Sequence, residues 1–162
     1  MAITTGSVAL AADITDLVYI VRKTADESVN NSAVFQNDDE LLLPMAANEV
    51  WYVKMFPIVN TLSTADIKYK WTVPAGGEIY QLGYGVDGAG ADQIFYGLNA
   101  MQSNGIGADA TYPNITLEGI VVNGANAGNL QLQWAQLAAQ VGNCTVKVNS
   151  CIIAHRILPA LY

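Results

Sequence analysis

Short runs in which apolar and polar residues alternate constrain the fold of this chain more than any other feature. In one run, Ile67, Tyr69 and Trp71 alternate with Lys68 and Lys70. Successive side chains of a β-strand point to opposite faces, so this pattern predicts a strand with one buried face and one solvent face. A Pro-Ala-Gly-Gly segment follows and is typical of a strand end.

Similar short runs recur along the chain, separated by turn residues, and no long segment has a helical period. Residues 131–140 have a helix-forming composition, but the placement of Leu130, Leu132 and Trp134 favours a strand there. We expect eight to ten short strands, a number typical of a sandwich or barrel. The fold class is therefore predicted as an all-β jelly-roll β-sandwich of about eight strands, formed by residues 16–162.

Two segments depart from simple alternation. The run Val50–Phe56 carries apolar groups on both faces, which predicts a strand in the centre of the fold. Residues 83–110 hold seven glycines, and only Ile94–Tyr96 has a strong β pattern there. We therefore expect long loops with one short strand in that zone.

Charge is scarce, because Asp, Glu, Lys and Arg make up 13% of the residues, compared with about 25% in an average soluble domain. A surface with so few charges predicts a protein that associates with copies of itself, although a neutral surface rich in small polar residues would have the same composition. The net charge of −7 argues against nucleic-acid binding. No apolar run is long enough to span a bilayer, and the first residues lack a secretion signal, so we expect synthesis and assembly in a cytoplasm.

The first fifteen residues are mostly small and polar and have no strong periodicity. Terminal segments of this kind become ordered only when something holds them in place. We interpret residues 1–15 as an N-terminal arm, and its apolar side chains are candidates for contact with a larger assembly: Ile3, Val8, Leu10 and Ile14.

An ordered set of short motifs resembles a block found in many structural proteins of tailed phages. The set spans residues 20–158 and departs from the common pattern at Asn149, where glycine is usual, and at Cys151, which begins the last strand. Asparagine tolerates a left-handed backbone, so we expect the turn at Asn149 to be kept. The motifs that carry the resemblance are Thr24–Ser32, Phe35–Leu41, Ala46–Trp51, Ala65–Lys68, Pro74–Gly76, Leu130–Gln136, Cys144–Ser150 and His155-Arg156.

The resemblance implies a jelly-roll similar to that of tumour-necrosis-factor-like trimers. Within phages it implies a capsid decoration (cement) protein, or a component of a head or tail fibre. The decoration protein would be a homotrimer that binds the major capsid protein on the outside of the phage head and stabilises the shell. The alternative is a fibre module that binds a host glycan through the Gly-rich loops, using Tyr84, Tyr96 or Asp92.

The sequence does not predict an enzyme. His155 is the single histidine, it lies in a strand-like run, and no nucleophile motif accompanies it. Cys144 and Cys151 are expected to be free thiols, although a hairpin between them would allow a disulfide. We expect no cofactor and no bound metal, since two cysteines and one histidine lack the spacing of a zinc site.

Two further groups of residues have alternative interpretations. The carboxylates of Asn37–Glu40 could bind calcium, but a solvated turn between two strands is favoured, and so is a simple loop at 87–92. Five aromatic residues in alternating strands are candidates for either the core or an oligomer interface: Trp51, Tyr52, Tyr69, Trp71 and Trp134.

Overall fold

A computed structural model describes residues 17–62, 64–86, 92–98 and 116–159. These residues form twelve strands and no helix, so the prediction of an all-β fold is confirmed. Every strand pair in the sheets is antiparallel. The number of strands exceeds the eight to ten expected, and the eight-stranded jelly-roll stays a prediction.

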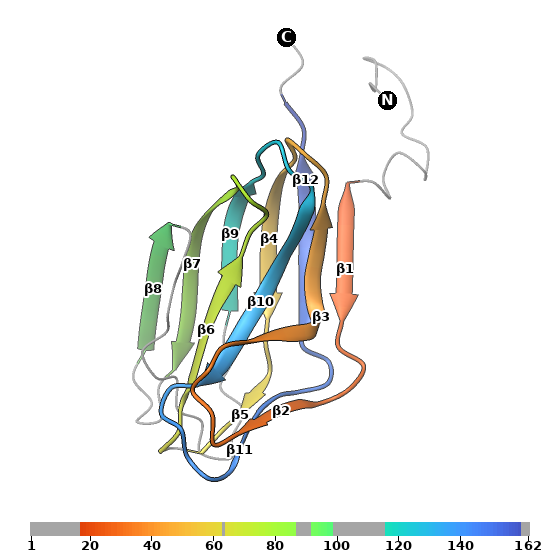
Figure 1. Cartoon of the computed structure of the whole chain (residues 1–162). Coiled ribbons are helices and arrows are strands. Elements are labelled where there is room, and N and C mark those ends of the chain that lie inside the picture. Colours follow the sequence, from red (N-terminus) through yellow and green to blue (C-terminus); the bar gives the residue numbers. More distant parts are fainter. Residues whose placement is uncertain (1–16, 63, 87–91, 99–115, 160–162) are drawn as a thin grey trace.

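The strands form one large sheet and two small ones (Figure 1). The large sheet has six strands in the order β1 (Val18–Arg22), β12 (Cys151–Ile157), β4 (Val50–Phe56), β9 (Thr116–Val122), β7 (Glu78–Val86) and β8 (Asp92–Leu98). The second sheet has the order β3 (Gln36–Met45), β10 (Gly128–Gln136) and β6 (Ile67–Thr72). The third has the order β2 (Glu27–Asn30), β11 (Asn143–Val146) and β5 (Val59–Asn60).

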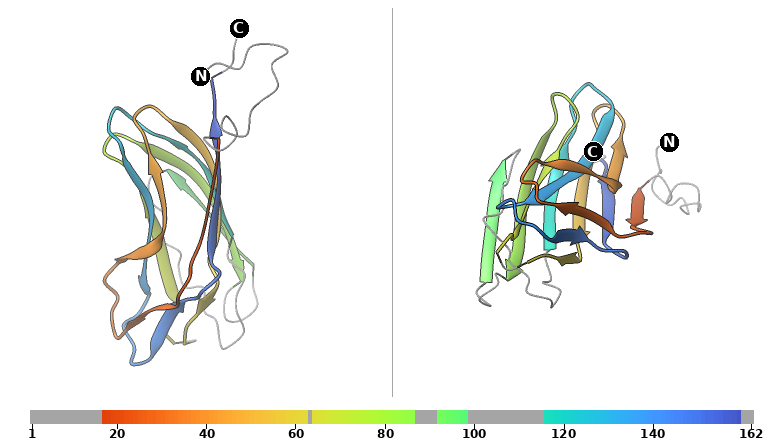
Figure 2. Two further views of the ribbon diagram at one scale, coloured as in Figure 1. Left: turned by 90° about the vertical axis from the view of Figure 1, so that its right-hand side faces the viewer. Right: turned by 60° about the horizontal axis from the view of Figure 1, so that its bottom comes forward.

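The six-stranded sheet and the β3-β10-β6 sheet lie face to face as two layers, which the left view of Figure 2 shows from the side. Strand β4 lies inside the large sheet, between β12 and β9, as its apolar character predicted. The burial of β6 alternates along its length, with Ile67, Tyr69 and Trp71 buried and the residues between them half-buried. The predicted strand over 130–136 is also confirmed, because β10 runs through it.

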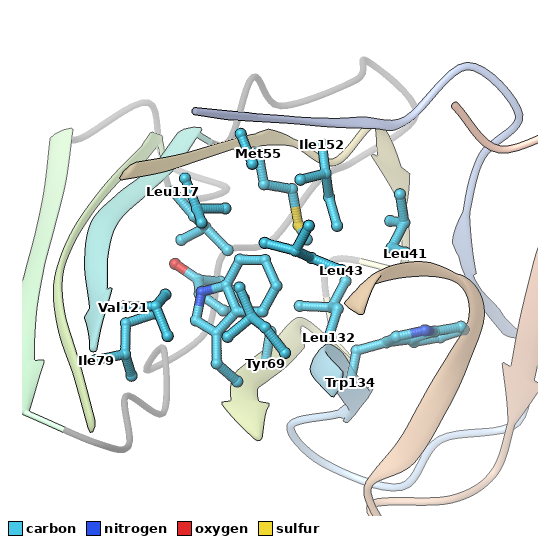
Figure 3. Packing of buried hydrophobic residues seen from close by; sticks show 14 of the residues in the cluster. Leu41, Leu43, Met55, Tyr69, Ile79, Leu117, Val121, Leu132, Trp134 and Ile152 are labelled. Carbon is cyan, nitrogen blue, oxygen red and sulfur yellow. The ribbon is translucent and has the colours of Figure 1, made fainter. Parts of the chain in front are cut away.

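The hydrophobic core fills the space between the two layers (Figure 3). Leu41, Leu43 and Leu132 from the smaller sheet face Met55 and Ile152 from the larger sheet. Full burial of one such side chain contributes about 1.5–3 kcal/mol, so this core is the main source of stability for the sandwich.

The Gly-rich zone is more regular than the sequence predicted. Strand β7 extends to Val86 and pairs with β8, which covers residues 92–98. The short strand predicted at Ile94–Tyr96 is confirmed as part of β8, whereas the expectation of a loop is wrong for 83–86. Residues 87–91 and 99–115 lie outside the described residues. The ladder to β9 on the other side of β7 compensates for the weak strand propensity of its glycines.

The acidic segment Asn37–Glu40 is part of β3 and not a turn, so that prediction is wrong. Strand β3 pairs with β10 in two stretches, with a register shift between Gln131 and Gln133, and the strand bends there (Figure 1). The bend turns Asp38 inward, where its side chain is fully buried.

A buried lysine neutralises this aspartate. The Nζ atom of Lys23 donates hydrogen bonds to Oδ1 of Asp38 at 2.8 Å and to Oε2 of Glu27 at 2.9 Å, and Lys23 is only 1% exposed. The backbone N–H groups of Glu40 and Leu41 also donate to Oδ1 of Asp38. Burial alone would lower the pKa of Lys23, but the hydrogen bonds to Asp38 and Glu27 outweigh it and raise the pKa.

One glutamine organises the end of β10. The side-chain Oε1 of Gln136 accepts hydrogen bonds from the backbone N–H of Ser32 at 3.0 Å and of Gln140 at 3.1 Å. Its Nε2 donates to the backbone carbonyls of Gln140 and Gly142. All of its hydrogen-bonding capacity is used, so a fully buried polar side chain closes the loop after β10 without an energetic penalty.

The buried ion pair generates a prediction about stability. Lys23→Met should lower the free energy of unfolding by about 3–5 kcal/mol, because it leaves the carboxylate of Asp38 buried without its counter-charge. Lys23→Met combined with Asp38→Asn should recover most of that loss, because the asparagine oxygen still accepts from the backbone and carries no charge. Urea denaturation measures both values, and a loss below about 1 kcal/mol in the single variant would contradict the role of the pair.

Candidate interaction surface

The six-stranded sheet has an outer face that the second layer does not cover. The pairing register shows which side chains lie on this face. It aligns Ile20 of β1, Ile153 of β12 and Lys54 of β4 in one row. A neighbouring row holds Tyr52 of β4, Ile120 of β9 and Tyr80 of β7. We call this surface the outer face, meaning the side chains at even positions of β1, β4, β9 and β7 as far as Tyr84, those at odd positions of β12, and Ile94 of β8.

The outer face is mainly apolar and partly exposed. Twelve large apolar side chains are exposed among the described residues, and seven of them lie on this face, so the exposure is concentrated on one surface. The largest exposed fractions there are 67% for Ile20, 63% for Ile94 and 53% for Tyr80. The other exposed members are Phe56, Tyr84, Val122 and Ile157. Concentrated apolar exposure of this kind is typical of an interaction site.

Charged groups near the middle of the outer face are paired with each other. The Nζ atom of Lys54 lies 3.6 Å from Oε2 of Glu118, and the hydroxyl of Tyr52 donates a hydrogen bond to the same oxygen at 3.1 Å. Lys54 Nζ also lies 5.2 Å from the centre of the Phe56 ring. Partial burial of Tyr52, together with its hydrogen bond to Glu118, raises the pKa of the hydroxyl, so it remains protonated and continues to donate.

The outer surface of the β3-β10-β6 sheet has the opposite character. Lys68, Lys70, Gln131 and Gln133 are half-buried there, and Gln133 Nε2 donates a hydrogen bond to Asn37 Oδ1 at 2.6 Å. This is the ordinary pattern of an antiparallel sheet with one solvated face. The two outer surfaces of the molecule therefore differ, one being apolar and the other polar.

The aromatic residues singled out from the sequence fall into two groups. Trp51, Tyr69, Trp71 and Trp134 belong to the core cluster, and each is at most 6% exposed. Tyr52 lies on the outer face and is half-buried. The arm residues Ile3, Val8, Leu10 and Ile14 lie outside the described residues.

Several members of the outer face were not found by reasoning from the sequence. Tyr80 lies in a segment for which we predicted no strand, and Ile94 was assigned only to a short strand among loops. The pairing of Lys54 with Glu118 joins residues that are far apart in the chain. The only local signal was the presence of apolar residues on both faces of residues 50–56.

Potential metal-ligating residues do not gather in the part of the chain that the structure describes. His155 lies in β12, in the same row of the outer face as Tyr52. Within residues 17–62, 64–86, 92–98 and 116–159, no three His, Cys, Asp or Glu side chains form a group able to hold a metal ion. Among the same residues, none forms a helix with the length and apolarity that crossing a bilayer requires.

The turn before β12 and the two cysteines follow the sequence expectations. Asn149 has a φ of 75°, which is the left-handed conformation predicted for it. Cys144 and Cys151 are both free thiols. Cys144 is fully buried in β11, whereas Cys151 at the start of β12 is partly exposed.

Comparisons with known proteins add little to this description. No family model and no curated protein matches the chain. Among solved structures, a chain from one described as "Structure of infectious bursal disease virus Gt strain" is 11% identical, with a TM-score of 0.18. The match covers 88% of this chain and 38% of that viral chain, and a likeness of this strength supports no conclusion about fold or function.

The two thiols should differ in reactivity. Burial raises the pKa of the Cys144 thiol to about 11, so only about one thousandth of it is thiolate at pH 8. We expect iodoacetamide to modify Cys144 more slowly than Cys151 in the folded protein. At pH values below 11, the rate for Cys144 should increase about ten-fold for each unit by which the pH is raised. Mass spectrometry of labelled peptides measures both rates, with unfolded protein as the control. Faster labelling of Cys144 than of Cys151 would contradict this prediction. A lack of labelling at both residues in protein unfolded without reductant would also contradict it, because it would indicate a disulfide between them.

Proposed function

We propose that this chain is a non-enzymatic virion structural protein that decorates the outside of a phage head. In this function it forms a homotrimer, binds the major capsid protein and stabilises the shell after synthesis in the host cytoplasm. The observation that carries the proposal is the contrast between an apolar outer face on one sheet and a polar surface on the other. A protein that buries one surface in an assembly and exposes another to water needs this contrast.

The scarcity of charge supports an assembly function. The chain has 21 Asp, Glu, Lys and Arg residues, and Lys23, Asp38, Lys54 and Glu118 are used in pairs within the chain. The resemblance of the motifs over residues 20–158 to phage structural proteins supports a virion as the assembly. Acidity keeps the free protein soluble before it docks, since like charges on separate copies repel.

Avidity would provide the stabilisation of the shell. Each trimer would contact several capsid subunits, so the second and third contacts form at a high effective concentration. Residues 1–15 would extend from the trimer and add to a sheet edge on the capsid or on a neighbouring trimer. An arm that becomes ordered on docking loses entropy, and it therefore favours binding only where its receptor site is complete.

Quantification of purified particles tests the proposal. A decoration protein should occur at a copy number comparable with that of the major capsid protein, and the free protein should rebind to stripped capsids. Quantitative mass spectrometry of virions and a sedimentation binding assay make the two measurements. A chain that is absent from particles, and that does not rebind, is not a decoration protein.

The arm generates a separate prediction. Deletion of residues 1–15 should leave a folded protein with the same oligomeric state and with weaker binding to stripped capsids, because only the docking contact is removed. Circular dichroism, light scattering and the same sedimentation assay test the three parts of this outcome. If the truncated protein binds with unchanged affinity, the arm has no part in the mechanism.

A fibre module that binds a host glycan is the second candidate. The observation in its favour is the exposure of Tyr80 and Tyr84 on the same face of β7, because tyrosine rings stack on sugar rings in many binding sites. Such a protein should be present in few copies per particle and should bind cells or a glycan array. Loss of that binding in Tyr84→Ala, with an unchanged fold, would favour this function over decoration.

A further inference from the structure

We infer that the outer face is the surface through which copies of this chain bind each other. The inference rests on the proposed function, which requires copies to associate but does not say which surface joins them. Two properties of the outer face lead to it, namely its size and the arrangement of its charges.

The size of the outer face matches that of a stable protein interface. Six strands spaced about 4.8 Å apart are about 29 Å wide, and seven residues at about 3.4 Å each are about 24 Å long, which gives about 700 Å² in flat projection. A standard interface buries about 800 Å² on each partner. The face is therefore large enough to form a specific contact with one neighbour or to be shared between two.

The arrangement of charges favours a copy of the same chain as the partner. Lys54 and Glu118 already neutralise each other within one chain, and Tyr52 supplies a further hydrogen bond, so the centre of the face can be buried without an unpaired charge. The face therefore offers no net charge near its centre to attract a charged partner. An apolar surface with a neutral pair is complementary to another surface of the same kind, and that surface is present on every copy.

The aromatic residues of the face also fit an interface that is wet before assembly. The hydroxyl of Tyr80 donates a hydrogen bond to Oε2 of Glu78 at 2.9 Å, while the residue is 53% exposed. The hydroxyl of the half-buried Tyr52 likewise donates to Oε2 of Glu118. Tyrosine is enriched at protein interfaces because its ring adds apolar contact area while its hydroxyl keeps a polar partner.

A pair of matched double variants tests the inference on the full chain. Ile20→Glu with Ile94→Glu places two carboxylates on the outer face, whereas Val34→Glu with Val141→Glu places two on loops that do not belong to it. All four positions are exposed, and both variants lower the net charge equally, so general repulsion is the same in each. Sedimentation velocity over a range of concentrations measures the mass, and circular dichroism and thermal melting check the fold.

The wild-type protein and the Val34/Val141 variant should be oligomers of the same mass, and the Ile20/Ile94 variant should be a folded monomer. Retention of the oligomer by the Ile20/Ile94 variant would overturn the inference. A monomeric wild type that still binds stripped capsids would also overturn it, and of the proposed function only the binding to the capsid would survive. An oligomer that the Ile20/Ile94 substitutions dissociate, and that never binds capsids, would support the inference and remove the proposed function.

The central charge pair provides a second measurement. Glu118→Gln keeps an acceptor for Tyr52 but leaves Lys54 without its counter-charge, so burial of the face should become unfavourable. Association should weaken by on the order of 100-fold or more, and addition of Lys54→Met should restore it to within about ten-fold of the wild type. If the outer face stays in water when copies associate, the exposed ion pair contributes little, and Glu118→Gln should not change the association constant. An unchanged association constant would therefore contradict the inference.

Discussion

A sheet has two faces, and the sandwich covers only one face of the six-stranded sheet. The β3-β10-β6 layer packs against its inner face, where Met55, Val121 and Ile152 are fully buried. The outer face carries apolar side chains as well, and no other part of the described chain lies over it. The fold therefore satisfies half of the hydrophobic requirement of its largest sheet and leaves the other half to contacts outside the described chain.

In the interior and on the outer face alike, a lysine is paired with a carboxylate. Lys23 is buried next to Asp38, and Lys54 lies next to Glu118 at the centre of an apolar surface. In both cases a carboxylate and an amine on different strands or loops compensate each other's charge, fully buried in the first pair and about one-third exposed in the second. Removal of one partner is costly in a dry environment, whereas the intact pair is nearly neutral in energy. Such pairs add little stability, but they restrict which arrangements of the chain, and of its neighbours, are acceptable.

The parts of the fold that follow from local pattern could be predicted from the sequence, and the parts that depend on distant partners could not. The strand at Ile67–Thr72 and the left-handed turn at Asn149 were evident from the residues alone. The acidic segment after Gln36 resembles a solvated turn because its counter-charge, Lys23, lies fifteen residues away. The full lengths of β7 and β8 were not predicted, because the glycines in and between them have a low strand propensity. In β9, a Cβ atom at Gly119 would lie 2.6 Å from the carbonyl oxygen of Tyr80, so this glycine permits close strand packing.

The outer face could not be found from any single segment, because it exists only once the strands are in register. The run Val50–Phe56 showed that one strand is apolar on both sides, and this pattern also fits a strand buried on both faces. The ladders align Tyr52 with Ile120 and Tyr80, and Lys54 with Glu118, and this alignment joins isolated residues into one surface with a paired charge at its centre. Because the opposite sheet exposes lysine and glutamine, the two sides of the molecule have different affinities for water. In the assembly that we propose, this asymmetry would set the orientation of each copy, with the apolar sheet facing its neighbours and the polar sheet facing solvent.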